Sequence, residues 1–372
     1  MEADAANPDS VVVRRGWVAR FRRALIEDVP FLSLVAGFTA TAFLLERTIG
    51  VPAHLNLQVS WDRMAVFTVL YCIPAVLGFL VYGKVVKQRS LFVAETWRAL
   101  MVRILEPAQS LNYLLIFVSL PFFMNVLLAF KASIPIIHPF AWDVRFMEWD
   151  RVLHFGLHPW QVLQPLLGQP AITRAIDFGY YLWFPVLWMT VIWQAWHGNR
   201  NTETRSQFLV AFAVCWILLG TVAAMLFSSA GPVYYAAVTG APDPYAPLLS
   251  YLEVVDAQDS LTAIFAQDAL WQAYADPGST RLGGISAMPS MHISMAVLLV
   301  LLGFRVQRWL GWLYVAFAGL IFLGSVHLAW HYAIDGYAAA AGTVVIWWAS
   351  GIVVRNWRTR IGLAPIRQIP DV

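Results

Sequence analysis

Long apolar runs, separated by short polar or basic segments, dominate this chain of 372 residues. Each run approaches the roughly 20 residues that an α-helix needs to cross a hydrocarbon core of about 30 Å. We therefore predict an all-α fold, a polytopic membrane helix bundle with about eight transmembrane helices. The predicted spans are residues 29–45, 64–82, 111–130, 175–196, 208–227, 288–302, 309–324 and 335–354.

The polar segments between these runs set the expected domain boundaries. The longest of them is acidic and has a single basic residue, so we expect a loop outside the membrane. A Trp- and Pro-rich stretch before it contains an amphipathic piece that is typical of the membrane interface. The expected parts are a basic tail at 1–28, one membrane domain at 29–354 with a catalytic core at about 171–354, the amphipathic piece at 148–167, the loop at about 228–285, and a tail at 355–372.

Composition supports this class and excludes a soluble domain. Hydrophobic residues make up 59% of the chain and charged residues 13%, whereas charged residues form about a quarter of a soluble domain. Most of the 25 lysines and arginines fall in every second connecting segment, and both tails are basic. Because basic segments tend to stay inside, we expect both termini in the cytoplasm and the acidic loop on the extracytoplasmic side.

The chemistry is concentrated near the end of the chain, in the stretch GSVHLAWHYAIDGY. His327, His331 and Asp335 follow one another at intervals of four, so that on a helix they share one face. A carboxylate one turn beyond a histidine can accept the proton of Nδ1, leave Nε2 as a nucleophile, and stabilise the cation formed by attack. His331 and Asp335 therefore predict a covalent histidine catalyst.

A second stretch, AMPSMHISMAV, opens the sixth predicted span. Pro289 suits the first turn of a helix, and the free N–H groups of that turn, with the Ser290 hydroxyl, would bind an anion such as phosphate. His292 could donate a proton to a leaving oxygen. Because one return span separates the two stretches, a helical hairpin brings His292 and His331 to the same membrane face. A nucleophile, an acid and an anion site together indicate phosphoryl transfer.

Two other classes compete with this interpretation. His327, His331 and Asp335 also fit the two-histidine, one-carboxylate metal site of a membrane oxidase or hydrolase, although known histidine-box enzymes need more clustered histidines. A transporter would place its polar residues in the middle of broken helices, whereas these residues lie at the ends of spans. Ionisable groups at membrane depth are costly, which favours a catalytic role for them.

PSMH, followed about forty residues later by HYAID, resembles the second and third signature motifs of the type 2 phosphatidic acid phosphatase superfamily. Its members are integral-membrane, metal-independent enzymes that work through a phosphohistidine. The resemblance implies that His331 is the nucleophile and that Asp335 orients it. It further implies that His292 is the leaving-group acid, that Ser290 binds phosphate, and that no metal or cofactor takes part. It is strong over about 282–342.

Departures from the usual motifs resemble one branch of that superfamily. Met291 stands where glycine is usual, Gly324 and Ser325 stand where Ser-Arg is usual, and SSAGPVYY stands where a Lys-x6-Arg-Pro motif would belong. These changes look like the inositol phosphorylceramide synthase branch of inositolphosphotransferases, as does the earlier segment MEWDRVLHFGLHPWQVLQPLLGQP. Partners are therefore expected among membrane lipids and not nucleic acids. The donor headgroup and the acceptor, a lipid alcohol or water, stay open.

The departures also leave a bound phosphate without its usual cationic partners. Arg281, shortly before the second motif, is the first candidate to replace them. Three basic residues nearer the amino terminus are further candidates: Lys131, Arg145 and Arg151. His327 is either a polar residue satisfied inside the bundle or a second phosphate ligand beside the nucleophile.

Overall fold

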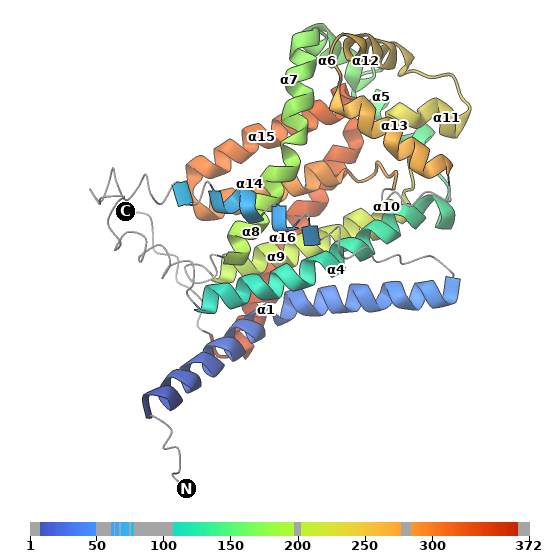
Figure 1. Cartoon of the computed structure of the whole chain (residues 1–372). Coiled ribbons are helices and arrows are strands. Elements are labelled where there is room, and N and C mark those ends of the chain that lie inside the picture. Colours follow the sequence, from blue (N-terminus) through green and yellow to red (C-terminus); the bar gives the residue numbers. More distant parts are fainter. Residues whose placement is uncertain are drawn as a thin grey trace.

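The computed structural model describes residues 8–49, 61–62, 64–66, 68–73, 76–77, 107–196, 202–276 and 284–363. All regular structure in these ranges is helical, which confirms the predicted all-α membrane bundle (Figure 1). Six stretches in these ranges are long and apolar enough to cross a membrane: Leu25–Leu45, Asn112–Ile137, Pro170–Trp196, Thr202–Leu226, Arg308–His327 and Ala333–Arg360.

Two other predicted spans correspond to shorter apolar helices. Met64–Ile73 carries part of the second, whose later residues lie outside the described part of the chain. The sixth is α14 (Met291–Val306), which packs against α9 (Thr202–Ile217), α15 (Arg308–His327) and α16 (Ala333–Arg360). The count of eight spans therefore stays a prediction.

The first helix differs from the predicted polar tail followed by a separate span. α1 (Pro8–Ile49) is continuous, so the basic segment and the first span belong to one helix. Pro30 lies inside it, and Figure 1 shows α1 as two arms that meet at an angle. A proline inside a helix removes a backbone hydrogen bond and bends the axis, which accounts for the angle.

Two of the spanning stretches are interrupted. The third consists of α7 (Pro170–Tyr181) and α8 (Trp183–Trp196), and α4 (Pro107–Ile137) packs on α8 and α1. The fourth begins as α9 and passes through a π-helical turn, η1 (Leu218–Ala223), into α10 (Ala224–Leu226). These interruptions lie beside the residues described below as the candidate site.

The predicted polar loop at 228–285 is largely helical where the structure describes it. Its helix α12 buries Leu248, Leu252 and Val255, an i, i+4, i+7 set that the acidic composition of the segment conceals. The segment contains η2 (Pro232–Tyr234), α11 (Tyr235–Thr239), α12 (Ala246–Gln258) and α13 (Thr262–Ala275).

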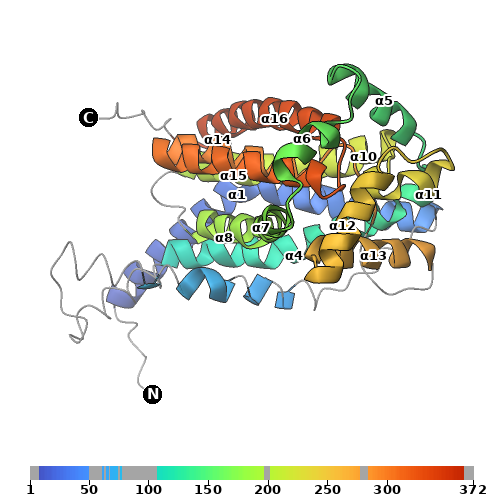
Figure 2. The same ribbon diagram turned by 90° about the horizontal axis from the view of Figure 1, so that it is seen from above.

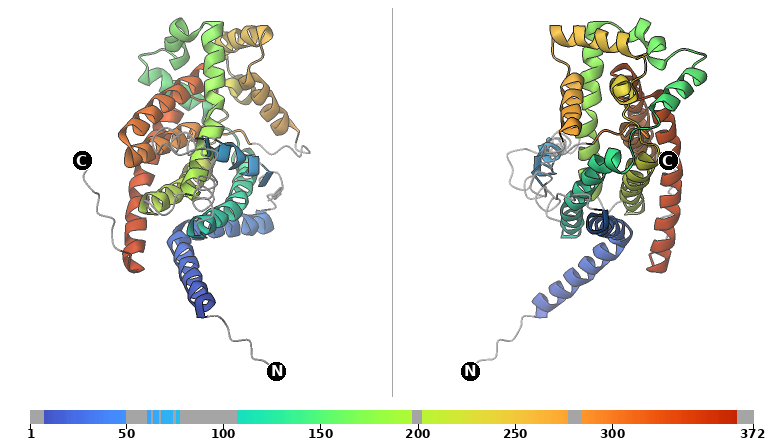
Figure 3. Two further views of the ribbon diagram at one scale, coloured as in Figure 1. Left: turned by 60° about the vertical axis from the view of Figure 1, so that its left-hand side comes forward. Right: turned by 90° about the vertical axis from the view of Figure 1, so that its right-hand side faces the viewer.

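Together with two earlier helices, these elements form what we call the cap. The earlier helices are α5 (Asp143–Leu153) and α6 (Pro159–Leu167), which divide the predicted amphipathic piece. Figure 2 shows α5, α11, α12 and α13 gathered at one end of the bundle. In Figure 3 the cap lies opposite the end where α1 begins and α16 finishes.

A buried ion pair joins α1 to the rest of the bundle. Arg205 of α9 donates from both terminal nitrogens to Asp28, with Nη2 2.9 Å from Oδ2, and its Nε donates to the backbone oxygen of Gln194. Both charged side chains are almost fully buried. In this bidentate pair the buried guanidinium replaces its hydrogen bonds to water with hydrogen bonds to the carboxylate. The pair therefore fixes α1 against α9.

Candidate active site

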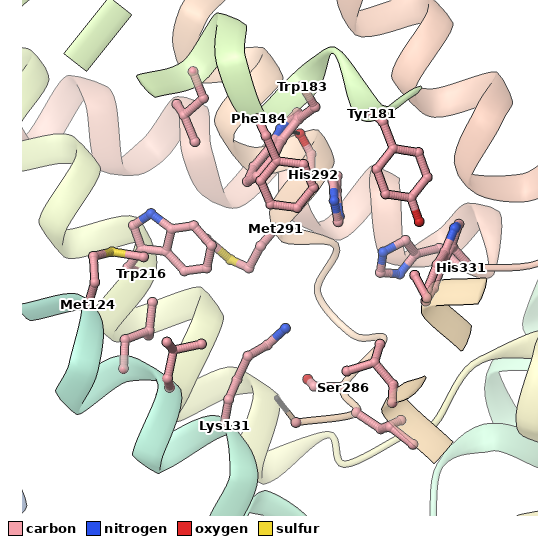
Figure 4. A pocket seen from close by; sticks show the side chains of 18 of the residues that line it. Met124, Lys131, Tyr181, Trp183, Phe184, Trp216, Ser286, Met291, His292 and His331 are labelled. Carbon is pink, nitrogen blue, oxygen red and sulfur yellow. Dashed lines mark hydrogen bonds between the residues drawn. The ribbon is translucent and has the colours of Figure 1, made fainter. Parts of the chain in front are cut away.

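The two histidines predicted to meet at one face do lie close together. The rings of His292 and His331 have centroids 6.1 Å apart. Both side chains line a cavity of about 580 Å³, which is bounded by α4, α8, α14 and the segments before α14 and α16 (Figure 4). Most of the lining is apolar, so the imidazoles form part of a small polar region in a largely hydrocarbon-like wall.

His331 is oriented by the acid four residues later. Its Nδ1 lies 3.3 Å from Oδ2 of Asp335, which also accepts a hydrogen bond from the backbone N–H of Tyr332 at 3.0 Å. Asp335 is the third residue of α16 and is fully buried. The carboxylate thus caps the helix start and contacts the imidazole through Nδ1, an arrangement that leaves Nε2 free.

Burial keeps His331 in its neutral form. Removal from water lowers the pKa of His331 to about 3, and the nearby positive charge of Lys131 acts in the same direction. A hydrogen bond with the backbone of Ala287 opposes them. A neutral imidazole has the free electron pair that nucleophilic attack requires, so His331 is available as a nucleophile at neutral pH.

His292 is held by aromatic side chains at the break between α7 and α8. Its ring stacks on Tyr180, with centroids 4.9 Å apart, and lies 4.4 Å from the ring of Trp183. The indole N–H of Trp183 donates to the backbone oxygen of His292 at 3.0 Å. The interruption at Leu182 therefore has a local function, because it brings these rings against the first turn of α14.

Ser290 forms the cap of α14 and does not line the cavity. Its hydroxyl accepts from the N–H of Ile293 at 3.5 Å, and its own N–H donates to the backbone oxygen of Asp335 at 3.2 Å. The cavity-lining serine is Ser286, which the motif pattern did not single out. Ser290 thereby joins the starts of α14 and α16, and its role in binding phosphate stays a prediction.

His327 lies in a separate polar cluster. Its Nε2 is 2.9 Å from Oγ1 of Thr173, and that hydroxyl is also 2.7 Å from the hydroxyl of Tyr251. The side chain is fully buried and is not part of the cavity lining. Of the two roles considered for it, this setting favours a polar residue held inside the bundle through Nε2, while its Nδ1 has no hydrogen-bond partner among the described residues.

The two-histidine, one-carboxylate metal site is not formed by the residues that the structure describes. Among them, no three His, Cys, Asp or Glu side chains come together in an arrangement that could hold a metal ion. His327, which that site would need, is engaged with Thr173. The metal-dependent alternative therefore lacks a ligand set in the described part of the chain.

The candidate cations are placed very differently from one another. Arg281 lies outside the described residues. Arg145 sits over the ring of Trp142, with its guanidinium carbon 5.2 Å from the centroid, and Arg151 is exposed in the cap. Lys131, on α4, lines the cavity that contains the two histidines.

The stretch SSAGP, which stands in place of a charged first motif, is a backbone junction. The backbone oxygen and the hydroxyl of Ser229 accept from the N–H groups of Ala287 and Met288 at 2.9 and 3.2 Å. Gly231 has φ +98°, and a Cβ added there would lie 2.7 Å from the backbone oxygen of Trp330. Glycine is therefore required where this stretch crosses the segment before His331.

Two buried carboxylates of α5 tie the cap to these junctions, and neither was predicted from the sequence as a site residue. Asp143 accepts from the N–H groups of Ala230 and Gly231 and from the hydroxyl of Tyr332, at 2.8 to 3.1 Å. Asp143 and the second carboxylate, Asp150, are held for the same physical reason: backbone N–H groups without a backbone partner attract a carboxylate. The only sequence signal was the Trp-Asp-Arg segment that contains the second of them, Asp150.

Asp150 caps α16, the helix that follows His331. Its two oxygens accept from the N–H groups of Ala333 and Ile334 at 2.7 and 2.9 Å. Burial raises the pKa of Asp150 to about 7, although these two hydrogen bonds act to lower it. Asp150 thereby fixes the first turn of α16, directly after His331.

Comparison with known proteins agrees with this arrangement. A family model described as the PAP2 superfamily matches residues 144–349, which run from α5 to within α16 and include both motif histidines and Asp335. Comparisons with curated proteins and with solved structures gave no match. The match covers more than half of the chain, and this integral membrane protein therefore belongs to the PAP2 superfamily.

Proposed function

We propose that this protein is a membrane phosphotransferase or phosphatase that acts on lipid phosphate esters through a phosphohistidine at His331. The observation that carries the proposal is the His331–Asp335 contact of 3.3 Å on the wall of a cavity that His292 also lines. In the proposed reaction these residues act as a neutral nucleophile, a carboxylate that stabilises its cation, and a second imidazole that donates to the leaving group once it is protonated.

The proposed reaction has two displacements at phosphorus. Nε2 of His331 attacks, a P–N bond forms, and the P–O bond to the leaving group breaks while His292 donates a proton to the departing oxygen. Asp335 accepts the Nδ1 hydrogen bond and balances the positive charge of the phosphoimidazole. In the second step an acceptor hydroxyl attacks phosphorus, His292 takes its proton, and the P–N bond breaks.

The cavity supports a substrate with a long apolar part. Its walls include Met124, Leu127 and Leu128 of α4 and Leu187 and Trp188 of α8, and both helices belong to spanning stretches. An acyl or prenyl chain placed there would leave water and gain about 0.8 kcal/mol for each buried CH₂. A small water-soluble phosphate ester would leave this surface uncovered.

Within this class, the motif departures favour an inositolphosphotransferase-like enzyme with a lipid alcohol as acceptor. A lipid- or polyprenyl-phosphate phosphatase, with water as acceptor, is the second candidate.

The charge distribution of the connecting segments supports cytoplasmic termini and an extracytoplasmic site. Cysteine introduced at Ser286, in the cavity lining, should react with an impermeant thiol reagent added from outside intact cells; reaction only after permeabilisation would reverse this orientation.

One experiment tests the activity and identifies the acceptor. The purified protein is incubated with labelled phospholipids, with and without lipid alcohols, and the products are identified by mass spectrometry. Samples quenched in SDS at alkaline pH should contain an acid-labile phosphoenzyme that is absent from His331→Ala and present in the control His138→Ala, which removes a histidine outside the cavity lining. Phosphoenzyme in His331→Ala would refute the assignment of the nucleophile.

A further inference from the structure

Lys131 occupies an unusual place for a charged residue. It lies within the apolar spanning stretch Asn112–Ile137 of α4, yet its side chain is directed into the cavity. Figure 4 shows its amine between Met291 on one side and Ser286 on the other, on the same open space that His292 and His331 border. Among the described residues that line this cavity, it is the one lysine or arginine.

The ammonium has no carboxylate to balance it in the part of the chain that the structure describes. No aspartate or glutamate is among the described residues lining the cavity, and no ion pair joins Lys131 to an acid in the described ranges. A half-buried cation with a mainly apolar surrounding is unfavourable unless an anion accompanies it. The cavity therefore favours an anionic ligand at this position.

The backbone around Lys131 is packed directly on the motif segment. A Cβ added to Gly284 would lie 2.2 Å from the backbone oxygen of Lys131 and 2.6 Å from the nitrogen of Ala132. Only a residue without a side chain allows this approach, so the segment that leads to His292 rests on α4 at Lys131. The distance between the cation and the second motif is thus set by a specific backbone contact.

We propose that Lys131 is the cation that binds the phosphate group of the substrate, in place of the basic residues that the motifs lack. Lys131 precedes the residues that match the PAP2 superfamily, so an element outside the matched region would complete the site. The ligand is a phosphate ester whose phosphorus lies between Lys131 and His331. This inference rests on the proposed function for the identity of the reacting group.

The electrostatic consequences agree with this placement. Burial is the main cause of the lowered pKa of His331, and the charge of Lys131 is the second. The two side chains are therefore close enough to interact electrostatically. A bound phosphate would neutralise the ammonium and draw negative charge toward the imidazole that attacks it. Lysine suits such a site because its compact charge sits on a flexible stem and can follow the phosphate through both displacements.

Phosphate binding to the intact protein in lipid nanodiscs tests the assignment without relying on turnover. Isothermal titration with inorganic phosphate is done for the wild type, Lys131→Met, which keeps the length of the side chain without its charge, and Lys131→Arg, which restores the charge. Arg174→Met is the matched control, because Arg174 is a cation on the surface of α7 that contacts Asp259 and does not line the cavity.

We expect Lys131→Met to weaken phosphate binding by roughly 10- to 100-fold, the range for losing a charge-assisted hydrogen bond. Lys131→Arg should recover most of this loss, and Arg174→Met should bind as the wild type does. Recovery by arginine separates a binding role from a packing role, since arginine fits the cavity less well. If Lys131→Met does not fold, Lys131→Gln is measured by the same criteria.

The two proposals fail in different ways. Wild-type affinity for phosphate in Lys131→Met, together with unchanged KM for a lipid substrate, would overturn the role of Lys131 and leave the proposed reaction intact. Loss of binding in Lys131→Met in a protein that forms no phosphoenzyme would support the anion site and count against the reaction.

Discussion

The residues matched by the superfamily and the helices α1 and α4, which precede them, contribute in different ways. The matched part holds His292, His331 and Asp335 through short backbone contacts among the starts of α14 and α16, the SSAGP junction and the cap. α1 and α4 supply spanning surface, the acid of the buried Asp28–Arg205 pair, and the part of the cavity wall that carries Lys131. The comparison suggests that the chemistry is built in the matched part and that contact with the substrate is extended by the helices before it.

The largest expected effect breaks the matched part. Asp335→Asn keeps the shape of the side chain but cannot stabilise a phosphoimidazole cation, so phosphoenzyme formation in a single turnover should slow by about 10³- to 10⁴-fold. Quench-flow with labelled substrate measures the rate. The wild-type unfolding midpoint should be nearly retained, and a rate within tenfold of wild type would show that Asp335 only caps α16.

The next effect tests the earlier helices through the Asp28–Arg205 pair. Asp28→Asn leaves the buried guanidinium without its counter-charge and should cost about 3–5 kcal/mol of stability, measured by thermal or denaturant unfolding in detergent. The double variant Asp28→Leu, Arg205→Met should recover much of this, because no charge is then left unpaired. The folded fraction should keep wild-type kcat; a parallel loss of kcat would join α1 to the chemistry.

A smaller effect is expected at the join between cap and core. Asp150→Asn keeps one acceptor for the first turn of α16 and loses the other, so kcat should fall by roughly 10-fold with little change in KM. Phe265→Ala, which truncates an exposed side chain of the cap, is the control. A change confined to KM would place Asp150 in substrate binding.

The raised pKa of Asp150 also makes the stability of the folded protein depend on pH in a definite direction. Its folded-state pKa of about 7 exceeds the usual unfolded value of about 3.9, so the folded protein binds more protons between these two values. Its contribution therefore favours folding at low pH and is lost as pH rises through 7. Unfolding midpoints at pH 5 and pH 8 should differ less in Asp150→Asn than in the wild type.

The smallest effect tests whether the α4 wall of the cavity contacts the apolar chain of the substrate. Met124→Trp enlarges a side chain of the α4 wall and should raise KM for long-chain substrates by roughly 5- to 10-fold, while short-chain analogues react as before. Phe178→Trp adds an indole to an exposed position as the control. Equal losses with both chain lengths would show that the wall of α4 does not contact the chain.

The sequence alone determined the features that depend on local spacing and composition. Apolar runs identify spanning helices because the hydrocarbon core imposes a length on each of them. The pairing of His331 with Asp335 follows from a four-residue interval at the start of a helix, and one return span brings His292 to the same end. The helix α12 was not predicted, because the acidic composition of its segment indicated a polar loop although the helix buries a stripe of leucine and valine.

Only the tertiary structure decided which residues surround that pair. Asp150 caps Ile334 from 184 positions away, and Lys131 meets the motif segment at Gly284, contacts that no period along the chain encodes. Ser290 shows the converse, since its motif position suggests a phosphate ligand while its hydroxyl caps α14. Short-range spacing determines local pairs, whereas the packing of distant helices determines what is buried beside them.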